Sequence, residues 1–153
     1  HALCLTEGKA KFVAHVHAEA LGGFLCSRAG AAPFLRPLFP DQIVVCGPAP
    51  AIVPYTDPGF PLALAVRRAL RSFHAQYGHP PRLLLMINHG PVALGQSARD
   101  ALAILLMAEK WARILHLTRA AGGPRHLPLR GARRIHLRPD EAVRRRCITG
   151  ASP

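Results

Sequence analysis

The sequence predicts one α/β domain in which strands and helices alternate and pack in layers. Segments rich in β-branched or continuous apolar residues, typical of strands, are separated by longer segments with the apolar spacing of helices. Half of the 153 residues are hydrophobic, enough to form one core. The longest uninterrupted apolar run, residues 101–108, is far shorter than the ~20 residues that cross a bilayer. We therefore expect a globular domain and no membrane partner.

In the first part of the chain, β-branched residues predict strands at 11–17 (KFVAHVH) and 42–46 (QIVVC). The small apolar residues of 18–29 predict a helix between them. Three prolines in 31–41 indicate a loop, and four in 47–59 indicate an extended connection.

In the second part, residues 60–77 form a predicted amphipathic helix with a proline at its second position. The continuous apolar centre of 82–88 (RLLLMIN) predicts a strand buried on both faces, and 92–94 continues extended. A short helix is predicted at 140–147.

A long helix is predicted at 98–119, with Ser97 as its N-cap and Asp100 in its first turn. Apolar residues at helical spacing are expected to face the core. These are Leu102, Leu105, Leu106, Ala108, Ala112, Ile114 and Leu115.

The chain carries a formal net charge of +12, and nine of its arginines lie between 119 and 146. With only three lysines among twenty basic residues, the arginine excess is typical of GC-rich coding sequence. We interpret residues 121–153 as a basic Pro/Arg-rich segment that is solvated or lies between subunits. Nucleic acid is not the expected partner, although an arginine tail that binds it is an alternative. That alternative predicts a steep salt dependence that vanishes when residues after 119 are deleted.

The four cysteines, at positions 4, 26, 46 and 147, have no metal-ligand or disulfide spacing. We expect reduced, mostly buried thiols in a cytoplasmic protein.

Three of the nine histidines are candidate metal ligands. His15 and His17 would share one face of the first strand, about 6.5–7 Å apart along it. That spacing lets two imidazoles converge on one Zn²⁺. His89 follows the most apolar strand, where α/β domains place functional groups. A lone H-x-H is weak evidence, and a core or turn histidine bonded to backbone is the alternative for each.

Three ordered motifs resemble the class II aldolase/adducin family. They are the strand around His15-Val16-His17, the connection Pro54-Tyr55-Thr56-Asp57-Pro58-Gly59, and Asn88-His89-Gly90 followed by a short strand and a long helix. The resemblance runs from His1 to about Leu117, so we expect residues 1–120 to be the family's core.

The resemblance implies a three-layer α/β/α fold around a central mixed sheet, and a homo-oligomer, usually a tetramer. It also implies Zn²⁺, or another divalent metal, bound by His15, His17 and His89. The implied activity is that of a lyase which cleaves a C–C bond in a phosphorylated sugar through a metal-stabilised enediolate. Epimerisation or dehydration through that intermediate, and a non-catalytic adducin-like assembly module, are the alternatives.

The chain also departs from the family. The family's catalytic glutamate and its phosphate-binding loops would precede His1, so we expect the N-terminal part to be missing and activity to be weak or nil. The catalytic residues are therefore unknown. Glu7 and Glu19 are candidate substitutes for the glutamate, although Glu19 is expected to open the next helix. Tyr55 and Tyr77 are expected to be turn and core residues, not proton donors.

Overall fold

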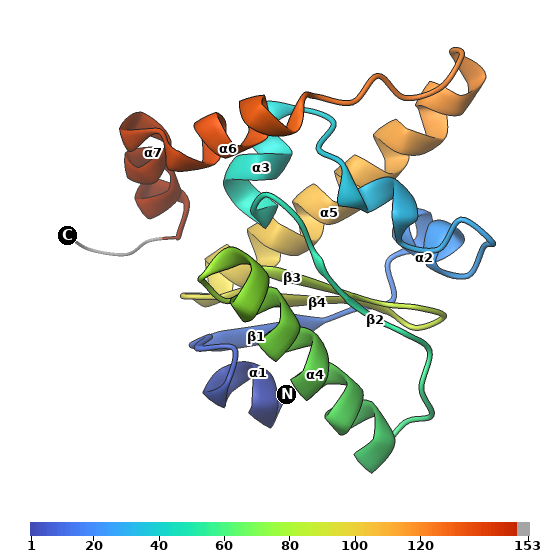
Figure 1. Cartoon of the computed structure of the whole chain (residues 1–153), viewed down its shortest axis with the longest axis vertical. Helices are drawn as coiled ribbons and strands as arrows, with labels where there is room; N and C mark the ends of the chain where they lie inside the picture. Colours follow the sequence, from blue (N-terminus) through green and yellow to red (C-terminus); the bar gives the residue numbers. More distant parts are fainter. Residues whose placement is uncertain (150–153) are drawn as a thin grey trace.

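A four-stranded mixed sheet forms the centre of the computed structural model (Figure 1), which describes residues 1–149 except the side chains at 133, 142, 145, 146, 148 and 149. Its strands are β1 (Phe12–His15), β2 (Ala51–Val53), β3 (Leu83–Met86) and β4 (Gly90–Gly95). They are ordered β1-β4-β3-β2. The β4 strand is antiparallel to both β1 and β3, whereas β2 is parallel to β3.

Helices cover both faces of the sheet, which makes the predicted three layers (Figure 1). On one face lie α1 (Ala2–Thr6) and α4 (Phe60–Tyr77), and on the other lie α2 (Glu19–Leu25), α3 (Pro40–Cys46) and α5 (Ala98–Ala120). Two further helices, α6 (Leu129–Leu137) and α7 (Pro139–Thr149), follow α5, and a 3-10 turn (η1) spans Ala32–Leu35. None of the described helices is long and apolar enough to cross a membrane.

Alternating residues of the central strand β3 belong to two separate hydrophobic cores, one on each face of the sheet. Leu83 and Leu85 of β3 pack with α2, α3 and α5, whereas Leu84 and Met86 pack with α1 and α4. All four side chains are buried. This confirms the prediction of a strand covered on both faces, because successive side chains of a strand point to opposite sides.

The predicted helices 60–77 and 98–119 are confirmed almost to the residue, because both carry strong local start signals. Ser97 caps α5, its Oγ accepting from the backbone N–H of Asp100 at 3.1 Å. The predicted inward face of α5 is wrong in part, since Leu102 and Leu106 are exposed. Asp100, Ala101, Ile104 and Trp111 are buried instead, so the buried stripe is rotated toward the sheet.

The predicted strand at 42–46 is wrong, because these residues form α3. Pro40 stands at the start of this helix, and Gly47 ends it with a φ of 87°. Both are typical of helix boundaries, but the β-branched residues between them favour a strand in the sequence. All five residues from Gln42 to Cys46 are buried, so no polar face marks the helical period. The penalty for valine or isoleucine in a helix is only a few tenths of a kcal/mol each, and burial outweighs it.

Four elements were not expected from the sequence: helix α1, the 3-10 turn η1, strand β2 and helix α6. The short strand β2 lies inside the proline-rich segment 47–59, where Pro50 and Pro54 flank it at the edge of the sheet. Proline is tolerated at an edge, where no neighbouring strand needs its missing N–H. Helix α6 lies in the basic segment, and the short helix predicted at 140–147 is confirmed as the longer α7. Residues 150–153 of that segment lie outside the described residues.

The expectation of mostly buried thiols holds for two of the four cysteines. All four are free; Cys4 and Cys46 are buried, while Cys26 and Cys147 are exposed.

Candidate metal centre

The structure brings together the three histidines that the sequence singled out. His15 is the last residue of β1 and pairs with Val92 of β4. His17 lies two residues further, beyond the end of the strand and not on it as predicted. The Nε2 atoms of the two rings are nevertheless 3.1 Å apart, with ring centroids 4.9 Å apart.

His89 reaches the other two rings from the tight turn between β3 and β4. Asn88, just before it, has a φ of 57°, a left-handed conformation that asparagine tolerates better than most residues. The His89 ring centroid lies 4.9 Å from that of His15 and 5.4 Å from that of His17. One ligand nitrogen from each histidine therefore lies within 4.8 Å of the other two.

A backbone contact fixes the tautomer of His15. Its Nδ1 lies 2.8 Å from the carbonyl oxygen of Pro91. Because a carbonyl oxygen only accepts, Nδ1 carries the proton and donates it, and Nε2 of the neutral ring keeps its lone pair. Metal-binding histidines are commonly held by such a bond from their second nitrogen.

Gly90 leaves the space in which the three rings meet. A Cβ at this position would lie 2.7 Å from the carbonyl oxygen of Val16, and 3.5 and 3.6 Å from atoms of the His15 and His17 rings. Its φ of 150° is also one that side-chain-bearing residues rarely adopt. Only glycine therefore lets the start of β4 pass this close to the segment 15–17.

The three imidazoles fit a divalent cation such as zinc. Zinc binds histidine nitrogens at about 2.0–2.1 Å in tetrahedral geometry, which places two such nitrogens about 3.3 Å apart. The His15–His17 spacing of 3.1 Å is close to that value. Partial burial, and then the neighbouring His15 and His17, lower the pKa of His89, which favours the neutral form that binds metal. Three protein ligands leave one position of a tetrahedral ion open.

A cavity of about 310 Å³ lies beside this group, on the face of the sheet that carries α1 and α4. His15 and His89 line one part of it, and apolar side chains such as Leu62, Val66 and Met86 line much of the rest. His15 and His89 are therefore accessible from a space large enough for a small ligand.

The candidate substitutes for a catalytic carboxylate do not join the group. Glu19 opens α2 and is exposed. Glu7 forms ion pairs with Arg67 and Arg71, each with an N–O distance of 2.8 Å. The bond from Arg71 is the main reason that the pKa of Glu7 is lowered. Glu7 is thus an ionised partner of α4, away from the three rings.

The two tyrosines are also outside the group. Tyr55 is exposed and donates to Asp57 at 3.1 Å, and that bond raises the pKa of Tyr55. Tyr77, at the end of α4, stacks on Phe73 with centroids 4.3 Å apart. Tyr55 thus agrees with its expected turn role, whereas the expectation that Tyr77 lies in the core is wrong, because it packs on Phe73 at the surface and is 37% exposed.

Part of the charge of the arginine-rich segment is paired within the chain. Arg138 forms an ion pair with Asp140, and Arg144 forms one with Asp41 at 3.2 Å. Arg119, which precedes the segment in the last turn of α5, lies over the Phe24 ring, 5.3 Å from its centroid. The described part of the segment therefore partly packs on the rest of the molecule.

Sequence reasoning missed two polar residues of α5 that contact α2. Glu109 accepts from the backbone N–H groups of Ala20 and Leu21, and His116 donates to the carbonyl oxygen of Ala20. Nothing in the local pattern of α5 distinguishes these side chains from solvent-facing ones.

The fold and the three-histidine group define the class of this protein. The family described as "Class II Aldolase and Adducin N-terminal domain" matches residues 1–116. The chain belongs to this family, which confirms the resemblance seen in the sequence.

Solved structures of this superfamily share the fold. YgbL from Klebsiella pneumoniae, described as "a putative aldolase/epimerase/decarboxylase", is 27% identical with a TM-score of 0.67, over 88% of this chain and 61% of that one. YgbL from Escherichia coli has the same description and coverage, at 23% identity and a TM-score of 0.65. An L-fuculose 1-phosphate aldolase is 22% identical with a TM-score of 0.63, over 81% of this chain and 53% of that one.

The chain thus spans about three fifths of the length of the YgbL structures. No curated protein matches the chain.

Proposed function

We propose that this chain is the metal-binding part of a zinc-dependent lyase that cleaves a C–C bond in a phosphorylated sugar. The observation that carries the proposal is the convergence of His15, His17 and His89, with ligand nitrogens within 4.8 Å of one another. Family membership and the likeness to an L-fuculose 1-phosphate aldolase support the reaction class.

The residues of this chain would hold and orient the reacting centre. His15 presents Nε2 because Pro91 holds its other nitrogen, and Gly90 keeps the space between the rings open. A cation bound there would supply Lewis-acid stabilisation of the negative charge that develops on substrate oxygens as the bond breaks. The cavity beside His15 and His89 is where the substrate would approach.

Proton transfer needs a group that the described residues do not place at the histidines, since Glu7, Glu19 and both tyrosines lie elsewhere. We therefore propose that this chain alone binds metal but cleaves sugar phosphates weakly or not at all. In the whole protein we propose a cytoplasmic homo-oligomer, by analogy with the family.

One observation favours a second reaction, epimerisation, at the same site. Both YgbL structures are described as an aldolase, epimerase or decarboxylase, so epimerisation remains the alternative reaction of this site. An adducin-like assembly module is the non-enzymatic alternative, and it would have no use for three converging imidazoles.

Elemental analysis of the purified chain tests the proposal. We expect about one zinc per chain after equilibration with Zn²⁺ and removal of the excess, and a strong loss of zinc in His89→Ala. His74→Ala is the matched control, because His74 is exposed near the end of α4. Equal zinc content in both variants, or none in the unaltered chain, would rule the metal site out. L-fuculose 1-phosphate then serves as the probe substrate for C–C cleavage.

A further inference from the structure

Helix α2 contacts both segments that carry the three histidines: the one with His15 and His17, and the turn with His89. It begins at Glu19, two residues after His17. At its other end, the carbonyl oxygen of Leu25 accepts from the backbone N–H of Asn88 at 3.2 Å. Asn88 directly precedes His89. The position of α2 therefore bears on both the segment that carries His17 and the turn that carries His89.

The start of α2 has no cap of its own. The N-cap residue is Ala18, whose side chain cannot accept a hydrogen bond. The first N–H groups of a helix have no partner within it, and here they lie at a partly buried position, since Leu21 is fully buried. Without another acceptor, this turn would leave backbone donors unsatisfied.

Glu109 of α5 supplies the missing acceptors across the helix–helix contact. Its Oε1 accepts from the backbone N–H of Ala20 and its Oε2 from that of Leu21, both at 3.1 Å. Bonds to a carboxylate are stronger than neutral ones, and a negative charge suits a helix N-terminus. Arg113 holds the carboxylate from its own helix, with its Nε 3.2 Å from Oε1.

A second contact from α5 supports the same turn. His116 donates from Nε2 to the carbonyl oxygen of Ala20 at 3.0 Å. Gly23 faces this ring, since a Cβ there would lie 3.4 Å from the same nitrogen. Two side chains of α5 thus bind the first turn of α2, Glu109 at its backbone N–H groups and His116 at a backbone carbonyl oxygen.

We propose that Glu109 is a positioning residue for the metal group, which it orders by fixing α2 between His17 and Asn88. The inference rests on the proposed metal site. Glu109 itself does not touch the three rings; it acts through α2. Removing its carboxylate is expected to let the first turn of α2 fray, so that fewer molecules hold His17 and His89 in the binding arrangement. Apparent affinity falls with the fraction that is competent.

The test measures zinc affinity by competition with a chromophoric chelator, and the absorption spectrum of the Co²⁺-loaded chain as a report on ligand geometry. Glu109→Ala is expected to weaken zinc binding about tenfold and to alter the Co²⁺ spectrum. Glu109→Gln keeps one acceptor oxygen, so its zinc affinity is expected to lie between that of Glu109→Ala and that of the unaltered chain.

A rescue variant separates positioning from general stability. Ala18 has the extended conformation of an N-cap, with φ −72° and ψ 132°. A serine there can accept from one of the two N–H groups that Glu109 serves. Ala18→Ser in the Glu109→Ala background is therefore expected to restore zinc affinity to within about threefold of the unaltered chain.

Ser97→Ala is the matched control, because it removes the N-cap bond of α5 instead of that of α2. It is expected to lower stability without changing zinc affinity. Unchanged affinity in Glu109→Ala or Glu109→Gln, or a rescue variant that regains stability but not affinity, would overturn the inference. Absence of zinc binding in the unaltered chain would instead refute the proposed metal site, so the two failures are distinguishable.

Discussion

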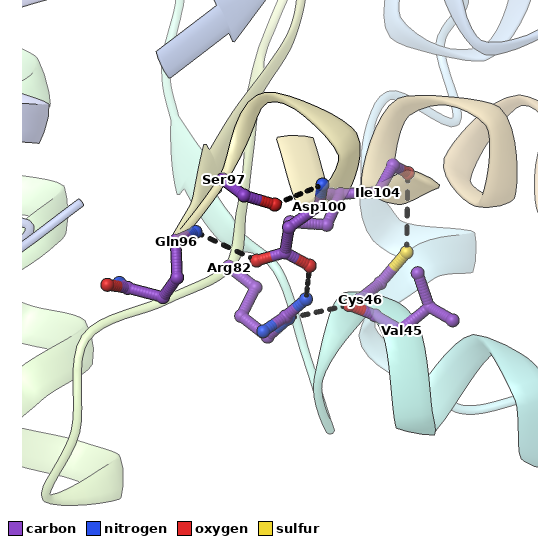
Figure 2. A network of polar contacts seen from close by, with 7 residues as sticks. All are labelled: Val45, Cys46, Arg82, Gln96, Ser97, Asp100 and Ile104. Carbon is purple, nitrogen blue, oxygen red and sulfur yellow. Dashed lines mark hydrogen bonds and ion pairs between the residues drawn. The ribbon is translucent and has the colours of Figure 1, made fainter. Parts of the chain in front are cut away.

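Arg82 and Asp100 form an ion pair in the interior, joining the start of β3 to the first turn of α5 (Figure 2). Asp100 is fully buried, and its other oxygen accepts from the backbone N–H of Gln96 at 2.9 Å. Arg82 also donates from Nε to the carbonyl oxygen of Val45, near the end of α3, at 2.7 Å (Figure 2). One pair thus links three elements on the face of the sheet opposite α4.

We predict that Asp100→Ala destabilises the fold by roughly 3 kcal/mol, because it leaves the Arg82 guanidinium without its carboxylate and the backbone N–H of Gln96 without its acceptor. Chemical denaturation followed by circular dichroism measures the loss. Asp140→Asn is the control: the ion pair of Asp140 with Arg138 is exposed, and its removal should leave the midpoint unchanged. Similar midpoints for the two variants would contradict the structural role of Asp100.

Zinc is predicted to raise the melting temperature of the chain. A ligand that binds only the folded state at about 100 times its Kd adds about 2.7 kcal/mol, or roughly 5–10 °C for a chain of this size. Differential scanning calorimetry with Zn²⁺ and then with a chelator measures the shift. His17→Ala should lose most of it and keep its metal-free melting temperature, since His17 is exposed. An equal shift in that variant would exclude His17 as a ligand.

Gly90→Ala is predicted to weaken both folding and metal binding. The added Cβ would lie 2.7 Å from the carbonyl oxygen of Val16, so the 15–17 segment must move away from the turn. We expect at least about 1 kcal/mol of destabilisation from the strained backbone alone. Zinc affinity and denaturation together report the effect.

The control for Gly90 is Gly22→Ala within α2. Beyond the chain neighbours and the backbone of α2 itself, no described atom lies within 4 Å of a Cβ at Gly22, so this change should be neutral or stabilise by up to about 1 kcal/mol. If Gly90→Ala behaved in the same way, the close approach of β4 to the histidine segment would be wrong.

Thiol labelling is predicted to divide the cysteines into two pairs. Burial raises the pKa of Cys46 to about 12, against an ordinary value of 9.0, and burial also raises the pKa of Cys4. Only the thiolate reacts with an alkylating reagent. At about pH 8, mass spectrometry should therefore find Cys26 and Cys147 labelled quickly and the other two only after unfolding. Rapid labelling of Cys46 in the folded chain would contradict its burial.

The raised pKa of Cys46 also predicts a loss of folding stability at high pH. Cys46 holds its proton more tightly when folded, so its contribution is complete below pH 9.0 and is lost as the pH rises from 9.0 toward about 12. In Cys46→Ala, the fall in unfolding free energy over this range should be smaller than in the unaltered chain.

The elements that could be predicted were those with strong local signals. Helix α5 has a serine N-cap and a long apolar repeat, and β3 has an uninterrupted apolar centre between breakers. Helix α3 was mistaken for a strand because a short, fully buried β-branched segment has no period to read. The edge strand β2 was missed because only its pairing with β3 makes it a strand.

The residue types of the metal group followed from the sequence alone, since H-x-H and N-H-G contain all three imidazoles in short motifs. Their convergence depends on antiparallel pairing, in which β4 brings the turn that carries His89 alongside the end of β1. The contacts of Glu109 with α2 and of Arg82 with Asp100 arise only in the folded chain. They join groups up to 89 positions apart, and local periodicity contains no information about which polar side chain will meet which uncapped backbone. Unpaired backbone groups at the ends of helices are satisfied by side chains that tertiary packing brings close. Those partners can therefore be identified only in the folded structure.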